Sequence, residues 1–223
     1  MTRVVALVPA RDEADRIAAT VASLHAMPAV DEVVVADDAS SDGTGSVALA
    51  AGASVLRVRR HLGKGGVMEG ALRRVDADVW LFADADLGET ASALAPVLEE
   101  VLAERADLAI AVLPAQEGGG FGLVKHAAAR AIRAACGFDA LAPLSGQRAV
   151  SARALAACRP LARGFGVETA MTIDAVRAGF GVHEVAADVR HRPTGRDVAG
   201  FAHRAWQGLD IATAALLRLG GLR

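Results

Sequence analysis

Short runs rich in valine alternate with helix-patterned segments through the first half of the chain. The runs predict strands at 4–8, 32–36, 55–58, 79–83 and 108–112, and apolar residues at three- and four-residue spacing predict helices at 14–25, 44–51, 65–75 and 91–104. Strands joined by helices of this length need parallel crossovers. We therefore expect an α/β fold with an open, mostly parallel sheet and helices on both faces. Such sheets bind ligands beyond the carboxyl ends of their strands.

The second half of the chain is less regular. Residues 116–120 form a polar, glycine-rich break that we interpret as a loop. The later pattern predicts helices at 123–135, 166–178 and 198–219, and strands at 144–150 and 183–190. No repeat or low-complexity linker divides the chain, so we expect a single domain over residues 1–223, made of two halves at 1–113 and 114–223.

Charge and composition exclude several classes of protein. The net charge of -2 leaves no basic footprint for nucleic acid. No apolar run approaches the roughly 18 residues of a membrane-spanning helix. Cys136 and Cys158 lack metal-ligand spacing and follow no signal peptide, which predicts reduced thiols and a cytoplasmic protein. A basic run within residues 190–204 is typical of a solvated face and also suits an anionic ligand.

Polar residues follow the first predicted strand. Pro9 should end that strand because it cannot donate to the ladder. Asp12 can cap the next helix, and Glu13 lies near the positive end of the helix dipole. Arg11 gains nothing as a cap, which favours a role in binding.

Two adjacent carboxylates, Asp37 and Asp38, end the second strand. Capping of the next helix does not need them, because Ser41 or Asp42 can supply it. Successive strand residues point to opposite faces, so only one of the pair can face a given ligand. We predict that Asp38 accepts hydrogen bonds from a base or a ribose.

The third and fourth strands also end in candidate binding residues. Gly63-Lys64-Gly65 offers backbone N–H groups and a movable cation at a helix start, which suits an anion. Asp84 and Asp86 follow the fourth strand, and strand geometry would place both carboxylates on one face, roughly 7 Å apart. Two such carboxylates need a cation, and oxygen ligands suit Mg²⁺ or Mn²⁺ bridged to phosphates. The alternative is a solvated loop in which Asp86 caps the next helix.

Four of these motifs, in order over the first 90 residues, resemble family 2 glycosyltransferases and their relatives with the GT-A fold. Residues 7–13 resemble the opening "hPxxNE" segment, with Asp12 in place of Asn, and residues 34–44 resemble "VVDDGSxDGT", with Ala36 and Ala39 as departures. Residues 63–65 match "GKG", and residues 84–86 match the DxD metal motif.

The resemblance implies a GT-A type fold with a nucleotide-binding first half and an acceptor-side second half. In the family, residues matching Pro9, Arg11 and Glu13 line the nucleotide pocket. Asp38 would contact the base, and Asp84 and Asp86 would serve ribose and metal. The donor-binding residues that we predict are Pro9, Arg11, Glu13, Asp38, Lys64, Asp84 and Ala85.

Segments of the second half resemble two groups of these enzymes. Residues 144–148 are similar to the "SGxR" segment of polyprenyl-phosphate glycosyltransferases. Residues 164–168 and 189–192 are similar to glucosyl-3-phosphoglycerate synthases, in which a histidine of a comparable "HR" segment completes the metal site. The resemblance implies His191 as a third ligand beside Asp84 and Asp86, and a nitrogen ligand would favour Mn²⁺.

An acceptor that carries a phosphate would need cationic and hydroxyl partners. The candidates that we predict are Lys125, Ser145, Gly146, Arg148 and Arg192. Lys125, like Arg130 and Arg133, also fits an ordinary solvated helix face. Glu168 is a candidate general base or orienting group, although an acceptor phosphate is already nucleophilic at pH 7 and needs no base.

The predicted reaction transfers a hexosyl group from UDP-sugar or GDP-sugar to an oxygen of a small phosphorylated or polyprenyl-phosphate acceptor. Asp86, Glu168 and Lys64 are the predicted catalytic residues, with the metal neutralising the leaving diphosphate. Inversion and retention both stay open. A sugar nucleotidylyltransferase and a nucleotide-binding protein without catalysis are the alternatives. Peripheral contact with the inner face of the membrane and a homodimer are also compatible with the sequence.

Overall fold

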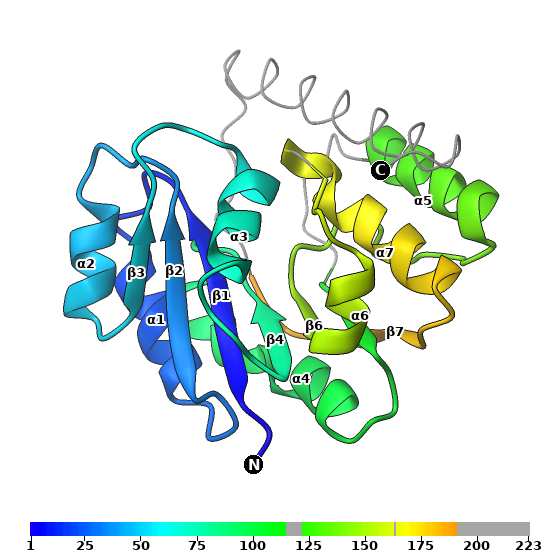
Figure 1. Ribbon diagram of the computed structural model, residues 1–223, viewed down its shortest axis with the longest axis horizontal. Coiled ribbons are helices and arrows are strands. Elements are labelled where there is room, and N and C mark those ends of the chain that lie inside the picture. The colour runs from blue at the N-terminus through cyan, green and yellow to red at the C-terminus, as the bar shows by residue number, and fades with distance from the viewer. Residues whose placement is uncertain (115–121, 163, 191–223) are drawn as a thin grey trace.

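A seven-stranded sheet forms the centre of the protein, in the order β3-β2-β1-β4-β6-β5-β7 (Figure 1). The structure is a computed structural model and describes residues 1–114, 122–162 and 164–190. The strands are β1 (Val4–Ala10), β2 (Glu32–Asp37), β3 (Ser54–Arg57), β4 (Val79–Phe82), β5 (Leu108–Val112), β6 (Arg148–Ser151) and β7 (Val182–Ala186).

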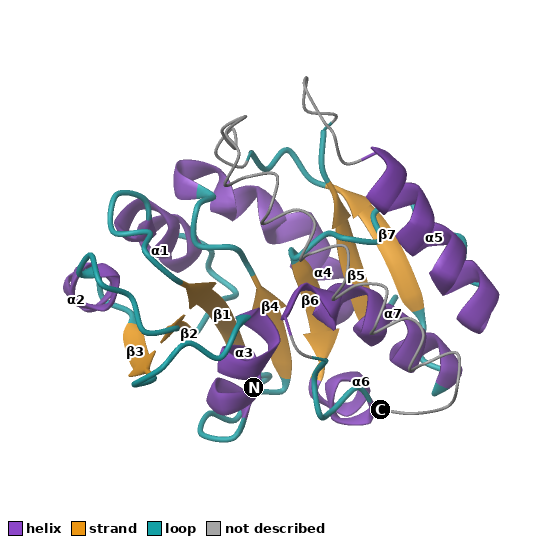
Figure 2. Cartoon of the chain, turned by 90° about the horizontal axis from the view of Figure 1, so that it is seen from above, coloured by secondary structure: helices purple, strands orange, loops and turns teal. Residues whose placement is uncertain are grey.

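Helices cover both faces of the sheet, as Figure 2 shows from above. The α-helices are α1 (Ile17–His25), α2 (Thr44–Ala50), α3 (Lys64–Leu72), α4 (Ala95–Leu102), α5 (Gly122–Cys136), α6 (Ala152–Ala157) and α7 (Val167–Arg177). Two short 3₁₀ helices are η1 (Gly88–Leu94) and η2 (Gly164–Gly166). Helices α1, α2 and α4 pack on one face of the sheet, and α3, α6 and α7 pack on the other.

The sheet is mostly parallel, as predicted. β1 pairs in parallel with β2 and β4, β2 with β3, and β5 with β7, whereas β6 runs antiparallel between β4 and β5. The four residues 33–36 of β2 are fully buried, and alternate ones belong to the apolar clusters on opposite faces. A central strand covered on both sides explains the continuous apolar run.

The prediction that Pro9 ends the first strand is wrong. β1 continues to Ala10, and Pro9 pairs with Ala36 of β2. The carbonyls of Val4 and Ala10 accept hydrogen bonds on the β2 side, and that of Leu7 accepts one on the β4 side. This alternation turns the missing N–H of Pro9 towards β4, whose pairing with β1 has already ended at Leu7, so no ladder bond is lost.

Other boundaries also differ from the predictions. The strand predicted at 144–150 forms only from Arg148, because residues 142–145 make a turn in which Ser145 N–H donates to the Ala142 carbonyl. The helix predicted at 91–104 begins as η1 and becomes α-helical at Ala95. Helix α6 was not predicted. The loop predicted at 116–120 and the helix predicted at 198–219 lie outside the described residues. In the described ranges, no helix has the length and apolarity needed to cross a membrane.

Candidate functional site

Lys64 connects the two halves of the chain. It is the first residue of α3, and its Nζ lies 2.7 Å from Oδ1 of Asp84 and 2.7 Å from Oε1 of Glu168. Burial by itself lowers the pKa of Lys64, but the two carboxylates outweigh that effect and raise it above its ordinary value. Lys64 therefore stays a cation between the end of β4 and the start of α7.

The Asp84-Ala85-Asp86 triplet is a turn and not the strand extension that the sequence analysis assumed. β4 ends at Phe82, because its pairing with β1 stops at that residue. The turn is fixed from below by Thr20 of α1, whose Oγ1 donates to the Ala85 carbonyl at 2.8 Å and accepts from Gly88 N–H at 2.8 Å. Ala85 is also buried, so the backbone that carries Asp84 and Asp86 is held in one conformation.

Residues 145–147 pack against the side chain of Asp84. The amide Nε2 of Gln147 donates to Asp84 Oδ2 at 2.6 Å, and Gln147 is fully buried. Gly146 packs so closely that a Cβ there would lie 2.5 Å from Lys64 Nζ and 2.9 Å from Asp84 Oδ2. The Ser145 hydroxyl donates to Gln147 Oε1 at 3.3 Å. Ser145 and Gly146, predicted as acceptor ligands, thus pack around the acidic residue of the donor side, and their acceptor role stays a prediction.

Sequence reasoning missed Gln147 as a site residue. The residue stands inside the quoted 144–148 segment, at the variable position of "SGxR". A buried amide beside a predicted metal carboxylate could have been found only by expecting this segment to fold back onto Asp84.

Arg148 is buried behind the site. Its Nε donates to the Ser145 carbonyl at 2.7 Å and its Nη1 to Thr172 Oγ1 at 2.9 Å, while Nη2 has no hydrogen-bond partner among the described residues. Burial lowers its pKa to about 10, against the opposing effect of the Glu168 charge. The contacts of Arg148 support the 145–147 segment from inside, and its acceptor-binding role stays a prediction.

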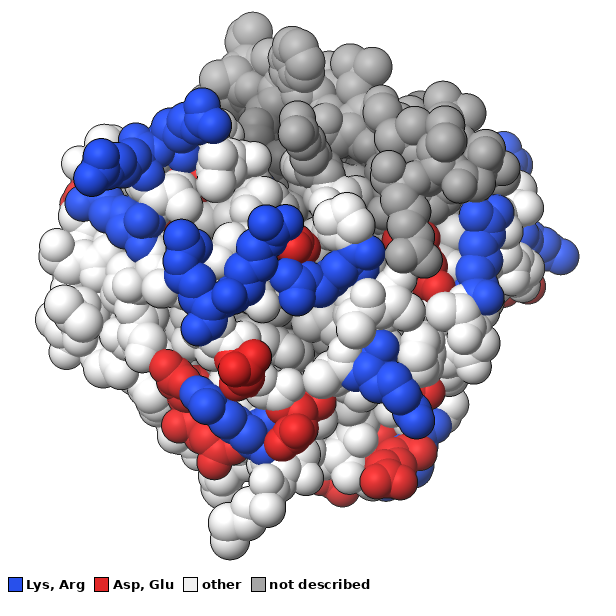
Figure 3. All heavy atoms as spheres, in the orientation of Figure 1, with Lys and Arg blue, Asp and Glu red and all other residues white. Residues whose placement is uncertain are grey.

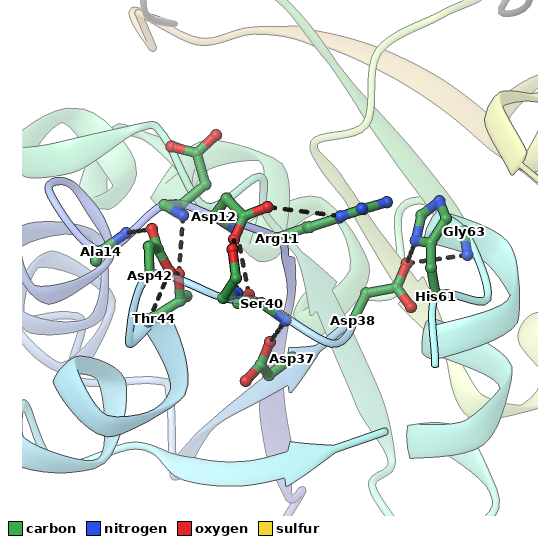
Figure 4. A network of polar contacts seen from close by, with 12 residues as sticks. Arg11, Asp12, Ala14, Asp37, Asp38, Ser40, Asp42, Thr44, His61 and Gly63 are labelled. Carbon is green, nitrogen blue, oxygen red and sulfur yellow. Dashed lines mark hydrogen bonds and ion pairs between the residues drawn. The ribbon is translucent and has the colours of Figure 1, made fainter. Parts of the chain in front are cut away.

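Asp38 holds the loop that leads to Lys64 (Figure 4). Its Oδ1 accepts from Leu62 N–H at 2.7 Å and its Oδ2 from Gly63 N–H at 2.9 Å, and His61 Nδ1 lies 2.7 Å from Oδ2. Asp37 points to the opposite side, as strand alternation predicts, and accepts from Ser40 N–H at 2.9 Å. The base contact predicted for Asp38 stays a prediction, and the structure adds a positioning role.

The segment after β1 is tied to the loop after β2, and Asp12 is not the helix cap that we expected. Its backbone has a positive φ of 53°, and its Oδ1 accepts from Ser41 N–H at 2.7 Å. α1 begins only at Ile17, so Asp12 is too far from the helix start to cap it. Figure 4 shows Arg11 extended beside Asp12, with Nε 3.6 Å from Oδ2.

Two further contacts fix this segment. Glu13 N–H donates to Thr44 Oγ1 at 2.8 Å, and Ala14 N–H donates to Asp42 Oδ2 at 2.9 Å. Asp42 also accepts from Thr44 N–H at the start of α2, but the N-cap of that helix is Gly43 and not Asp42 or Ser41. The predicted nucleotide residues Pro9, Arg11 and Glu13 therefore follow one another on a restrained segment at the carboxyl end of β1.

The acidic turn suits a divalent cation of the kind that binds phosphates. Magnesium is commonly held by one or two carboxylates together with phosphate oxygens, and Asp84 and Asp86 would supply the carboxylates. No cluster of three His, Cys, Asp or Glu residues with metal-binding geometry occurs within the described ranges. The predicted third ligand His191, together with Arg192, lies outside those ranges. Lys125 is exposed on α5, and its acceptor role stays a prediction.

Comparison with known proteins gives a consistent result. The family model described as Glycosyl transferase family 2 matches residues 5–148. The chain is similar to solved structures of glucosyl-3-phosphoglycerate synthase from Mycobacterium tuberculosis. In the complex with Mn²⁺, uridine diphosphate and phosphoglyceric acid, the identity is 27% and the TM-score 0.82, covering 98% of this chain and 79% of that one.

A second complex of the same synthase, with Mg²⁺ and uridine diphosphate, matches at 27% identity and a TM-score of 0.83, covering 100% of this chain and 80% of that one. No curated protein matched the sequence. These likenesses confirm the GT-A type fold and the predicted similarity to the synthases. The family model covers well over half of the chain, and the protein is therefore a glycosyltransferase that belongs to glycosyl transferase family 2.

Proposed function

We propose that the protein transfers a hexosyl group from a UDP-sugar, in the presence of Mn²⁺ or Mg²⁺, to a small acceptor that carries a phosphate. The observation that carries the proposal is the bridge from Asp84 through Lys64 to Glu168, which joins the acidic turn to the second half of the chain. Support for UDP and for a phosphate-bearing acceptor comes from the similar synthase, whose structures contain uridine diphosphate and phosphoglyceric acid.

The chain's own residues would bind the donor in three places. Arg11 and Glu13 follow the carboxyl end of β1, where the nucleoside would lie, and Asp38 would complete its pocket. Lys64 would place its ammonium group beside the diphosphate, since cations aimed at developing negative charge stabilise the transition state. A divalent cation held by Asp84 and Asp86 would neutralise the charge of the departing diphosphate.

Glu168 suits an orienting role better than that of a general base. Its carboxylate is almost completely buried and is engaged with Lys64 at 2.7 Å. We infer that it holds the ammonium group in place while the acceptor approaches. Removal of Glu168 should therefore disturb Lys64 before it changes any proton transfer.

The alternatives of the sequence analysis carry less support. Membership of the family favours glycosyl transfer over nucleotidyl transfer, and a binding protein without catalysis would have no need for both the acidic turn and the cation of Lys64 beside it. Cytoplasmic location, contact with a membrane, and a homodimer stay predictions.

A thermal-shift panel tests the donor. UDP, UDP-glucose, GDP and GDP-mannose are compared with Mn²⁺ and with EDTA. A ligand at one hundred times its dissociation constant should stabilise the protein by about 2.7 kcal/mol. We expect this shift for the uridine compounds with Mn²⁺ and its loss in EDTA. A larger shift with the guanosine compounds would identify guanine, and not uracil, as the base of the donor. If no nucleotide gave a metal-dependent shift, the proposal would be overturned.

Catalysis is tested by release of UDP from UDP-glucose, with 3-phosphoglycerate and glycerol 3-phosphate as acceptor probes. The Asp86→Asn variant should lose activity while keeping its fold, because only the charge of the acidic turn is removed. Asp139→Asn is the matched control, since Asp139 is exposed and pairs with Arg133 at 2.9 Å. Equal activity in the two variants would remove Asp86 from the mechanism.

A further inference from the structure

A second concave site lies at the edge of the sheet. β3 is the last strand on its side, and between β3 and α3 there is a cavity of about 560 Å³. Its walls are residues 55–60 and 62 on one side and residues of α3 on the other. Within the described ranges, none of the predicted donor-site residues lines it.

Arginine dominates the charge of this cavity. Its lining includes Arg57, Arg59, Arg60 and Arg74, and no aspartate or glutamate from the described part of the chain. Figure 3 shows the same face as Figure 1, with Lys and Arg gathered over its upper left and centre, where β3 and α3 lie, and acidic groups mainly below. Like charges crowded at one place repel each other, and an anion would relieve that repulsion.

Most of the positive charge is not neutralised by the protein. Arg57 is compensated, since its Nε lies 3.4 Å from Asp37 Oδ2. Arg59 and Arg60 are exposed and form no ion pair with any residue that the structure describes. Arg74 donates from Nη1 to the Gly70 carbonyl at 2.9 Å, which holds its guanidinium group on α3.

Protection of an edge strand explains only part of this arrangement. Charged residues on an edge strand prevent pairing with other chains, and that would account for Arg57, the last residue of β3. Arg74 follows α3, on the opposite wall of the same cavity. Positive charge on both walls of a concave site indicates a ligand between them.

The apolar residues that line the cavity indicate what kind of anion it can bind. Leu56, Val58, Val67 and Ala71 give the cavity an apolar floor. Guanidinium groups bind phosphate oxygens in pairs of parallel hydrogen bonds, and the volume is within the range of small-molecule sites. We propose that the cavity between β3 and α3 binds a polyanion that carries phosphoryl groups, separately from the donor site.

Calorimetric titration with inorganic pyrophosphate tests the proposal, with EDTA present to keep metal out of the donor site. The Arg59→Gln/Arg74→Gln double variant should bind pyrophosphate about tenfold more weakly than the wild type, because it loses two solvent-exposed charge pairs with the ligand. The matched control is Arg73→Gln/Arg105→Gln. It removes the same charge from two arginines outside the cavity, each of which pairs with a glutamate. The control should bind like the wild type.

Gly70→Leu tests the cavity without changing charge. A Cβ at Gly70 would meet only Arg74 Nη1, at 3.7 Å, so there is room for a Cβ, and Gly70 lines the cavity that the larger side chain should reduce. This variant should also lose pyrophosphate binding. Equal affinity in the wild type and both cavity variants, or equal weakening in the control, would overturn the proposal.

Sedimentation with vesicles distinguishes a free phosphate from a lipid headgroup. Vesicles of phosphatidylcholine with phosphatidylglycerol are compared with vesicles of phosphatidylcholine alone. Binding to the anionic vesicles that the Arg59→Gln/Arg74→Gln variant loses and the control keeps would assign a headgroup as the source. Pyrophosphate binding without vesicle binding would assign a free phosphate. If the protein bound neither pyrophosphate nor the anionic vesicles, the proposal would be overturned.

Discussion

The ammonium nitrogen of Lys64, at the start of α3, lies 2.7 Å from Oδ1 of Asp84, which follows β4 and stands 20 positions later in the chain. The same nitrogen lies 2.7 Å from Glu168. One partly buried cation thus balances two acidic side chains from opposite halves of the chain. This balance makes the site sensitive to any change of charge or space around Lys64.

Lys64→Met should destabilise the fold as well as the reaction. The substitution leaves the buried carboxylate of Glu168 without its cation, and removing the partner of a buried charge costs about 3 kcal/mol. Urea unfolding at pH 7 measures the loss. Arg73→Met is the control, because the exposed pair of Arg73 with Glu69 should contribute less than about 1 kcal/mol. Adding Glu168→Gln to Lys64→Met should restore part of the stability, and strict additivity would contradict the coupling.

Gly146→Ala should reduce both activity and stability. The new Cβ would lie 2.5 Å from Lys64 Nζ, so the lysine or the backbone must move, at a cost of about 1–3 kcal/mol. Thermal unfolding and UDP release measure the two effects. Gly181→Ala is the control, since its Cβ would meet neighbours only at 3.9 Å. If the two variants behaved alike, close packing at Gly146 would have no functional weight.

Gln147→Leu should lower the affinity for the metal more than it lowers the stability of the fold. The amide orients the Asp84 carboxylate through a 2.6 Å hydrogen bond, and loss of such a supporting contact typically costs about 10–100-fold in metal affinity or activity. Activity titrated with Mn²⁺ should show a higher half-saturating concentration. Ser145→Ala removes only the longer 3.3 Å contact to Gln147 and should change it less. An unchanged Mn²⁺ requirement would leave Gln147 a purely structural residue.

Glu69 should contribute stability that disappears in acid. Burial alone raises the pKa of Glu69, but hydrogen bonds from Arg159, Leu161 N–H and Arg73 outweigh it and lower the pKa below its ordinary 4.5. A lowered carboxyl pKa stabilises the fold above the unfolded value and loses that effect as pH falls through the folded one. Glu69→Gln should therefore cost about 1–3 kcal/mol at pH 7.

Unfolding measured at several pH values tests whether the charge of Glu69 provides this stability. Urea unfolding of the wild type and Glu69→Gln should give curves that converge as pH falls below 4.5, towards the lowered pKa of the folded state. Glu99→Gln is the control, because Glu99 is an exposed glutamate of α4 and its replacement should change stability little. A difference at Glu69 that was constant with pH would indicate that shape, and not charge, carries the effect.

Much of the donor side could be predicted because its signals are local. A continuous apolar run such as 33–36 predicts a strand that is buried on both faces. Polar residues that follow parallel strands must lie at the same edge of the sheet. Asp38, Lys64 and Asp84 are predicted in this way to lie at one edge, and Asp38 does contact Gly63, the neighbour of Lys64, while Lys64 contacts Asp84. The errors at Pro9 and Asp12 arose from general residue preferences, which the hydrogen bonds of neighbouring strand ends overrode.

The sequence by itself determined the α/β alternation, the order of the donor motifs and the chemistry of their side chains, because each depends on residues close together in the chain. Only the tertiary structure decided that antiparallel β6 lies between β4 and β5. That insertion brings Gln147 to Asp84 across 63 positions and Glu168 to Lys64. It also buries Arg148, which looked in sequence like a surface ligand. Such contacts depend on how distant segments pack, and no local pattern records them.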